Sequence, residues 1–296
     1  MNRKPVWMIF VLLVASLVNT PGAAAAEPPI VIAGSERMAP LVRKLAQRYV
    51  ELHPDVTIEV KGGGSGEGIE KLAKEAATIA ALARPVTDDE IRLIRLMRRT
   101  DLVGIPIAMD AVVFFVSPEN GLMSLTLEQI NKIYTHKITT WEELGLPSHP
   151  SGSPVEKPIR RHVLALDSGS VKVVQRRAMH GKGYTIARIE HKVTRDVVNA
   201  VAADPLALGF GGMGYTSGVE TVAVRKEAGS TAVFPTPETT RNREYPLAHY
   251  LYFYFAGQPS GRAKGFLRFI ISLEGQAIVR TSGTGAVTLP MSTSRQ

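Results

Sequence analysis

The sequence has 296 residues, no cysteine and a formal net charge of +8 at pH 7. The lack of cysteine excludes disulfides, thiolate metal sites, thiol nucleophiles and the lipidated cysteine of an exported lipoprotein, so the fold depends on a hydrophobic core, for which the chain is long enough. The positive charges form no basic tail, which leaves two interpretations: a solvated basic surface, or a protein that binds an anionic ligand.

The first 26 residues have the order of a secretory signal peptide. Arg3 and Lys4 precede an apolar run over 6–18, and four alanines follow at 23–26. An N-terminal membrane anchor is the alternative, but the run is shorter than the roughly 20 apolar residues that span a bilayer. We therefore expect cleavage before Glu27 and export to the periplasm.

Short strands and helices then alternate along the chain. Apolar patterns predict strands at 30–32, 56–60 and 78–83, with amphipathic helices over 41–52, from 69 and from 91. Thr87 and Glu90 have the spacing of a capping box at the start of the third helix. This alternation favours the α/β class with parallel strands.

The rest of the chain continues in the same way. Strands are predicted at 111–116, 162–166 and 245–255, with a short helix over 141–144 and longer helices around 174, 194, 266 and 277. Thr126 with Gln129 forms another cap pattern, and Thr194 is predicted to cap its helix. The segment LGFGGMGY at 208–215 is predicted to be a glycine-rich turn.

One loop is unusually rich in glycine. Residues 60–72 read VKGGGSGEGIEKL and lie between a predicted strand and the first turn of a helix. The first N–H groups of a helix have no partner within it and favour an anion, and a loop without side chains lets one approach. Ser65 is placed to cap this helix or to donate its hydroxyl to the anion. A tight structural turn is the alternative.

Eight segments occur in the order found in the phosphate-binding protein of phosphate ABC transporters, and the sequence resembles that periplasmic family over nearly its whole length. The segments are IAGSERMAPL, PDVTIEVKGGGSGEGIEKL, IPIAMDAVVFFVSPEN, LTLEQINKIYTHKITTWEELG, DSGS, LGFGGMGY, YPLAHYLYFYF and FLRFIISLEGQAIV.

The resemblance implies a two-lobed α/β periplasmic binding protein fold of type II, with the ligand in a cleft between helix N-termini of both lobes. Two crossing strands, near 105–112 and 243–250, would join the lobes. On this basis lobe one comprises 27–110 and 245–296, and lobe two comprises 111–244, after the signal peptide at 1–26.

The resemblance also implies a set of ligand-binding positions. The candidates are Ser35, Arg37, Ser65, Gly66, Arg84, Ser168, Gly169, Ser170 and Lys172.

Several of the family's anion contacts are missing from this sequence. Ala83 stands where the family has a serine, Leu166 where it has an arginine, and Thr78 where an aspartate is often found. Charge-assisted hydrogen bonds to an oxyanion contribute about 1.5–3 kcal/mol each, so these losses lower phosphate affinity unless other groups replace them. Arg37 and Lys172 are the candidates to do so; the alternative is that both point into solvent.

Other function classes find little support. The seven histidines lack metal-ligand spacing such as H-E-x-x-H, and each is predicted to be a surface or loop residue. No G-x-S-x-G motif surrounds Ser35, Ser65 or Ser170, as a hydrolase nucleophile would require. The aromatic residues do not alternate with Lys or Arg, which argues against nucleic-acid binding. We therefore expect no enzyme, no metal and no cofactor.

Two functions remain open. The first is a monomeric receptor that binds phosphate or a related oxyanion and delivers it to a membrane ABC permease. The alternative is a scaffold of the same fold that has lost high-affinity phosphate binding and acts in sensing or protein interaction.

Overall fold

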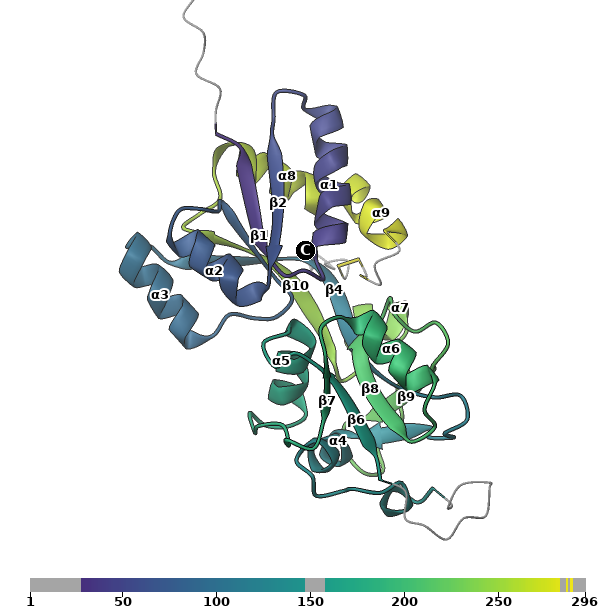
Figure 1. Ribbon diagram of the computed structural model, residues 1–296. Helices are drawn as coiled ribbons and strands as arrows, with labels where there is room; N and C mark the ends of the chain where they lie inside the picture. Colours follow the sequence, from purple (N-terminus) through teal and green to yellow (C-terminus); the bar gives the residue numbers. More distant parts are fainter. Residues whose placement is uncertain (1–27, 147–157, 283–285, 287, 290–296) are drawn as a thin grey trace, which may run out of the picture.

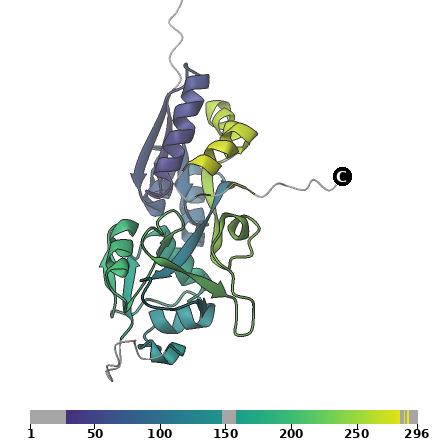
Figure 2. The same cartoon turned by 90° about the vertical axis from the view of Figure 1, so that its right-hand side faces the viewer.

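The computed structural model describes residues 28–146, 158–282, 286, 288 and 289, so the predicted signal peptide lies outside the described residues. Two lobes lie end to end and are joined by two long strands (Figures 1 and 2). The strands form one ten-stranded sheet that continues from lobe to lobe in the order β2-β1-β3-β10-β4-β8-β6-β7, with β5 and β9 beside this path.

Lobe one is a sheet with helices on both faces. Its elements are β1 (Ile30–Gly34), α1 (Ala39–Leu52), β2 (Ile58–Gly63), α2 (Ser65–Ala73), β3 (Ile79–Leu82), α3 (Asp88–Arg98), α8 (Gly261–Ile271) and α9 (Leu273–Thr281). Strand β1 pairs in parallel with both β2 and β3. Because side chains alternate along a strand, Ile79 and Ala81 pack with α1, α8 and α9, whereas Ala80 and Leu82 pack with α2 and α3.

Strands β4 (Leu102–Val116) and β10 (Ala248–Ala256) cross between the lobes. β4 pairs with β10 from Leu102 to Ala111 and with β8 (Ala207–Gly212) from Val112 to Val116. The apolar pattern predicted only the second half of β4, since Gly104, Pro106 and Asp110 interrupt it in the first half, whereas the crossing strand near 105–112 that the resemblance implied falls within β4. Antiparallel pairing with β10 holds that half in the sheet, and a register shift lies opposite Pro106.

Lobe two surrounds an aromatic core. Its further elements are β5 (Ser124–Thr126), α4 (Leu127–Tyr134), the short 3₁₀ helix η1 (Glu142–Leu144), β6 (Arg160–Leu164), α5 (Gly169–Arg177), β7 (Ile189–His191), α6 (Thr194–Ala202), β9 (Glu220–Arg225) and α7 (Pro237–Arg241). The ring of Phe210 lies 5.3 Å from that of Phe114 and 5.4 Å from that of Tyr134, measured between centroids. Such pairs stabilise a core beyond the area they bury.

The two cores meet near the start of β10. Tyr245 and Leu247 pack in the core of lobe two, whereas Leu251 and Phe253 pack in that of lobe one. We propose that the boundaries between the two lobes lie between residues 110 and 111 and between residues 244 and 245.

The prediction of a turn over 208–215 was wrong at its beginning, because β8 continues as a strand to Gly212. A Cβ on Gly209 would lie 2.8 Å from side-chain atoms of both Val197 and Val201 on α6. The glycines thus let α6 pack closely on the strand, and the chain turns only beyond Gly212, where the Tyr215 amide donates to the Gly212 carbonyl at 3.1 Å.

The predicted helix caps had different outcomes. Capping boxes at Thr87 with Glu90 and at Thr126 with Gln129 are both confirmed. The predicted cap at Thr194 is wrong: Val193 takes the cap position of α6, and Thr194 is the first helical residue.

Two histidines contradict the expectation that all seven lie on the surface or in loops. His162 lies in β6 and is 5% exposed, and His249 lies in β10 and is 3% exposed. The two rings of His162 and His191 stack, with Nδ1 of the first 2.9 Å from Nε2 of the second. Burial lowers the pKa of His162 to about 4 and that of His249 to about 3.

Candidate functional site

A cavity of about 550 Å³ lies between the two lobes. Lobe one contributes Ser35, Glu36, Arg37, Gly63, Gly64 and Ser65, and lobe two contributes Leu164, Ala165, Asp167, Ser168, Gly169, Ser170, Lys192, Val193, Thr194 and Tyr215. A hollow of about 790 Å³ over α1 and β2 is larger but belongs to lobe one alone.

Four helices begin at this cavity, and residues at their starts or just before them form much of its lining. The turn at 35–37 precedes α1, Ser65 opens α2, Ser168 and Gly169 open α5, and Val193 with Thr194 opens α6. In Figure 1, α2 and α5 lie at the facing edges of the two lobes. The first amides of each helix have no acceptor within the helix and carry partial positive charge, so the cavity is suited to an anion.

The glycine-rich loop is shaped in part by a carboxylate of the protein itself. Glu36 accepts a hydrogen bond from the Gly63 amide at 2.7 Å, and a Cβ on Gly62 would collide with its carboxylate. Gly63 and Gly64 have φ values of +119° and +95°, which favour glycine. The loop is therefore both a structural turn and a lining of the cavity.

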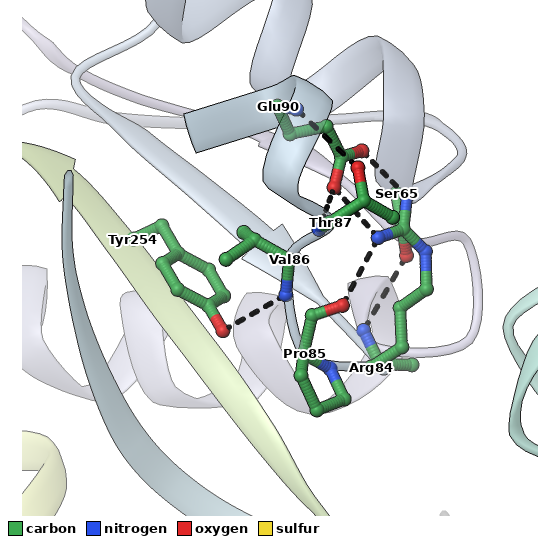
Figure 3. A network of polar contacts seen from close by, with 8 residues as sticks. Ser65, Arg84, Pro85, Val86, Thr87, Glu90 and Tyr254 are labelled. Atoms are coloured by element: carbon green, nitrogen blue, oxygen red, sulfur yellow. Dashed lines mark hydrogen bonds and ion pairs between the residues drawn. The ribbon is translucent and has the colours of Figure 1, made fainter. Parts of the chain in front are cut away.

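Ser65 lies in the lining with its hydroxyl still able to donate. It is the first residue of α2 and does not cap that helix, because Gly64 takes the cap position. Its side chain is buried, and Oγ accepts a hydrogen bond from the Ala83 amide at 3.4 Å (Figure 3). Ser35 is also buried and lines the cavity. Gly66 follows in the first turn of α2 but lies outside the lining.

Arg84 is occupied elsewhere. Its guanidinium donates to both carboxylate oxygens of Glu90, from Nη1 at 2.8 Å and from Nη2 at 2.6 Å, and to the Pro85 carbonyl at 3.1 Å (Figure 3). Burial acts to raise the pKa of the Glu90 carboxyl, whereas the hydrogen bonds from Arg84 and Thr87 lower it. The hydrogen bonds outweigh burial, so the pKa lies below its usual value. Arg84 lies outside the cavity lining and instead holds the start of α3.

Arg37 points into the cleft and links the lobes. It forms an ion pair with Asp110 of β4 and donates a hydrogen bond to the Ser170 hydroxyl on α5. Its side chain is 16% exposed, which contradicts the alternative that it points into solvent. Burial lowers the pKa of Arg37 to about 10, still far above neutral pH, so the guanidinium is charged.

Asp110 is a residue of the site that the sequence analysis missed. It is 5% exposed and lies opposite His249 in the β4–β10 pair, and its Oδ1 accepts a hydrogen bond from the Ala111 amide at 2.7 Å. A signal was present, since an aspartate within an otherwise apolar strand is seldom buried without a cationic partner.

Only some of the predicted site residues at the start of α5 line the cavity. Ser168 caps the helix, accepting from the Val171 amide at 3.3 Å, and Gly169 approaches lobe one so closely that a Cβ there would lie 3.2 Å from Cβ of Ala83. Lys172 is exposed and lies outside the lining.

The cavity lining also includes residues that the sequence analysis did not propose as site residues. Glu36, Asp167, Lys192, Val193 and Tyr215 come from loops that meet only in the folded protein. The described residues contain no group of three or more His, Cys, Asp or Glu side chains that could hold a metal ion.

Comparison with known proteins places this geometry in a family. A sequence model described as the PBP superfamily domain matches residues 19–274. The chain belongs to the PBP superfamily. It is 27% identical over 263 residues to the phosphate-binding protein PstS of Pseudomonas aeruginosa strain PAO1, covering 84% of this chain and 80% of that protein. It is 28% identical over 264 residues to PstS of Bacillus subtilis strain 168, covering 88% and 81%.

Solved structures of PBP-like receptors have the same architecture. A phosphate ABC transporter substrate-binding protein from Clostridium perfringens, with bound phosphate, matches with a TM-score of 0.72 and 25% identity over 88% of this chain and all of that one. A phosphate transport receptor from Vibrio cholerae has a TM-score of 0.72 and 22% identity, over 88% and 99%. The predicted two-lobed α/β fold is confirmed.

Proposed function

We propose that the protein is an extracytoplasmic receptor that binds phosphate or a related oxyanion between its lobes and delivers it to a membrane ABC permease. One observation carries the proposal: Ser65 at the start of α2 and Ser168 to Ser170 at the start of α5 line one cavity from opposite lobes. Amide and hydroxyl donors that converge from two lobes can surround an oxyanion, and each lobe alone supplies only part of the set.

The names of the relatives support this ligand class. The PstS proteins are called phosphate-binding, and the Clostridium perfringens protein is described with bound phosphate. Export by a cleaved signal peptide and delivery to a permease belong to the proposal. Within the described part of the chain, no helix combines the length and the apolar character needed to span a bilayer. The same relatives give no support to an enzymatic role.

The alternative function, a scaffold without high-affinity phosphate binding, is favoured by one observation. Three charged groups at or near the cavity already have partners within the protein: Arg37 pairs with Asp110, Arg84 pairs with Glu90, and the Glu36 carboxylate accepts a hydrogen bond from the Gly63 amide. A ligand must therefore compete with these contacts or bind beside them.

Titration calorimetry with inorganic phosphate on refolded, ligand-free protein separates the two functions. The receptor predicts saturable binding that Ser65→Ala weakens by about tenfold to a hundredfold, since a hydrogen bond to a charged group contributes about 1.5–3 kcal/mol. Ser260→Ala is the matched control, because Ser260 also stands at a helix start in lobe one without a side-chain cap bond and lies outside the cavity. If neither phosphate nor another oxyanion binds to the unchanged protein or to the Ser65→Ala variant, the result favours the scaffold.

A further inference from the structure

We propose that the cleft takes an oxyanion with a compact organic substituent, such as a phosphomonoester or a phosphonate, in preference to inorganic phosphate. This inference rests on the proposed function, because it assumes that the oxyanion is held at the starts of α2 and α5. It adds the class of ligand that fills the rest of the cavity.

The first argument is size. Inorganic phosphate has five heavy atoms, and even if each took the roughly 30 Å³ that a water molecule occupies in the liquid, the ion would fill about 150 Å³. The cavity measures about 550 Å³. A bare phosphate at the helix starts thus leaves most of the cavity to water or to another part of a ligand.

The second argument is the chemistry of the remaining walls. Lobe two lines the cavity with Leu164, Ala165, Val193 and Tyr215, from the end of β6, the start of α6 and the turn after β8. Val193 is 53% exposed and Tyr215 is 37% exposed. Leu164 is buried, so the apolar surface open to a ligand is that of Val193 and of the Tyr215 ring. Such surface gains from contact with an apolar group of a ligand, which inorganic phosphate lacks.

The third argument is charge. It favours a neutral organic substituent on the ligand over a second phosphate group. The lining contains two cations, Arg37 and Lys192, and two carboxylates, Glu36 and Asp167. Arg37 is already paired with Asp110. A ligand of higher charge, such as pyrophosphate, would have little uncompensated positive charge to meet, whereas a monoester or phosphonate brings one anionic group and a neutral one.

Calorimetry with inorganic phosphate, methyl phosphate, phenyl phosphate and pyrophosphate tests the inference. We expect phenyl phosphate to bind at least tenfold more tightly than inorganic phosphate, with methyl phosphate between them and pyrophosphate weakest. Val193→Thr keeps the shape of the side chain and makes it polar, so it should lower the ratio of phenyl phosphate affinity to inorganic phosphate affinity at least threefold. Tyr215→Ala should reduce the same preference.

The control is Ile186→Thr, which makes the same kind of change at a residue that is 93% exposed and outside the lining. If inorganic phosphate binds as tightly as phenyl phosphate, or pyrophosphate binds most tightly, the inference is overturned and the proposed function stands. If none of the four ligands binds, the proposed function fails and the inference fails with it. A preference for phenyl phosphate that survives both cavity variants also overturns it.

Discussion

Arg37 and Asp110 form an ion pair that ties the start of α1 to β4, one of the two strands that cross between the lobes. The same guanidinium donates to Ser170 on the other lobe, so one side chain connects lobe one, a crossing strand and lobe two. The carboxylate is 7% exposed as a side chain and the guanidinium 16%, so water screens the pair only weakly.

Asp110→Asn should therefore destabilise the protein by about 3 kcal/mol, because it leaves the Arg37 charge poorly compensated. Urea unfolding followed by circular dichroism measures the change. Arg37→Met removes the other partner, and in the double variant the two losses should be strongly less than additive. Additive losses would show that the two side chains do not stabilise each other.

Two glycines of α2 should respond to alanine in opposite ways. A Cβ on Gly68 would lie 2.7 Å from the Ala33 carbonyl oxygen and 2.8 Å from Cα of Gly34, so Gly68→Ala should cost about 1–3 kcal/mol of unfolding free energy. A Cβ on Gly66 meets nothing within 4 Å, so Gly66→Ala should be neutral or stabilise by up to about 1 kcal/mol. Equal effects of the two variants would contradict the close packing of α2 on β1.

The buried histidines predict loss of stability in mild acid. Their pKa values are about 4 for His162 and about 3 for His249 in the folded protein, against about 6.5 in an unfolded chain. Below about pH 6.5 the unfolded state takes up protons that the folded state resists, so stability is full above that pH and falls toward pH 4, by up to about 1.4 kcal/mol per pH unit for each histidine.

Chemical unfolding at a series of pH values measures this slope. His162→Gln should reduce it, whereas His136→Asn should not, because His136 is exposed and its φ of +64° suits asparagine. A stability that stays constant between pH 6.5 and pH 4.5 would show that the two rings are not held neutral by burial.

Much of the fold could be predicted because local patterns and packing agree. The strands and helices of lobe one have clear periodicity, and both capping boxes form as their spacing predicts. The failures have tertiary causes. β8 is a strand despite its glycines because α6 packs directly on it, and the first half of β4 depends on its pairing with β10.

The site was predictable only in part. Ser35, Ser65, Ser168, Gly169 and Ser170 lie in the cavity, because helix starts that follow strands gather at one edge of an α/β sheet. The partners of the charged residues could not be read from the sequence. Arg37 finds Asp110 far along the chain, Arg84 turns to Glu90, and Lys172 lies outside the lining, since side-chain direction depends on elements that meet only on folding.

Export is a prediction that depends on residues outside the described structure. If the alanines at 23–26 form the cleavage site, protein recovered from the periplasm should begin at or near Glu27, because the peptidase requires small residues just before the cut. N-terminal sequencing of the recovered protein measures this. Full-length protein that begins at Met1 and stays with the membrane would refute cleavage.

The central claim, that an oxyanion is held between the helix starts of both lobes, is tested most directly by nuclear magnetic resonance of the backbone amides during titration with phosphate. The account predicts that the amides of Ser65 and Gly66 on α2 and of Gly169 and Ser170 on α5 shift together and saturate at the same phosphate concentration. The amide of Gly261, at the start of α8 and outside the cavity, should not move. Shifts confined to one lobe, or absent from both helix starts at saturating phosphate, would contradict the account.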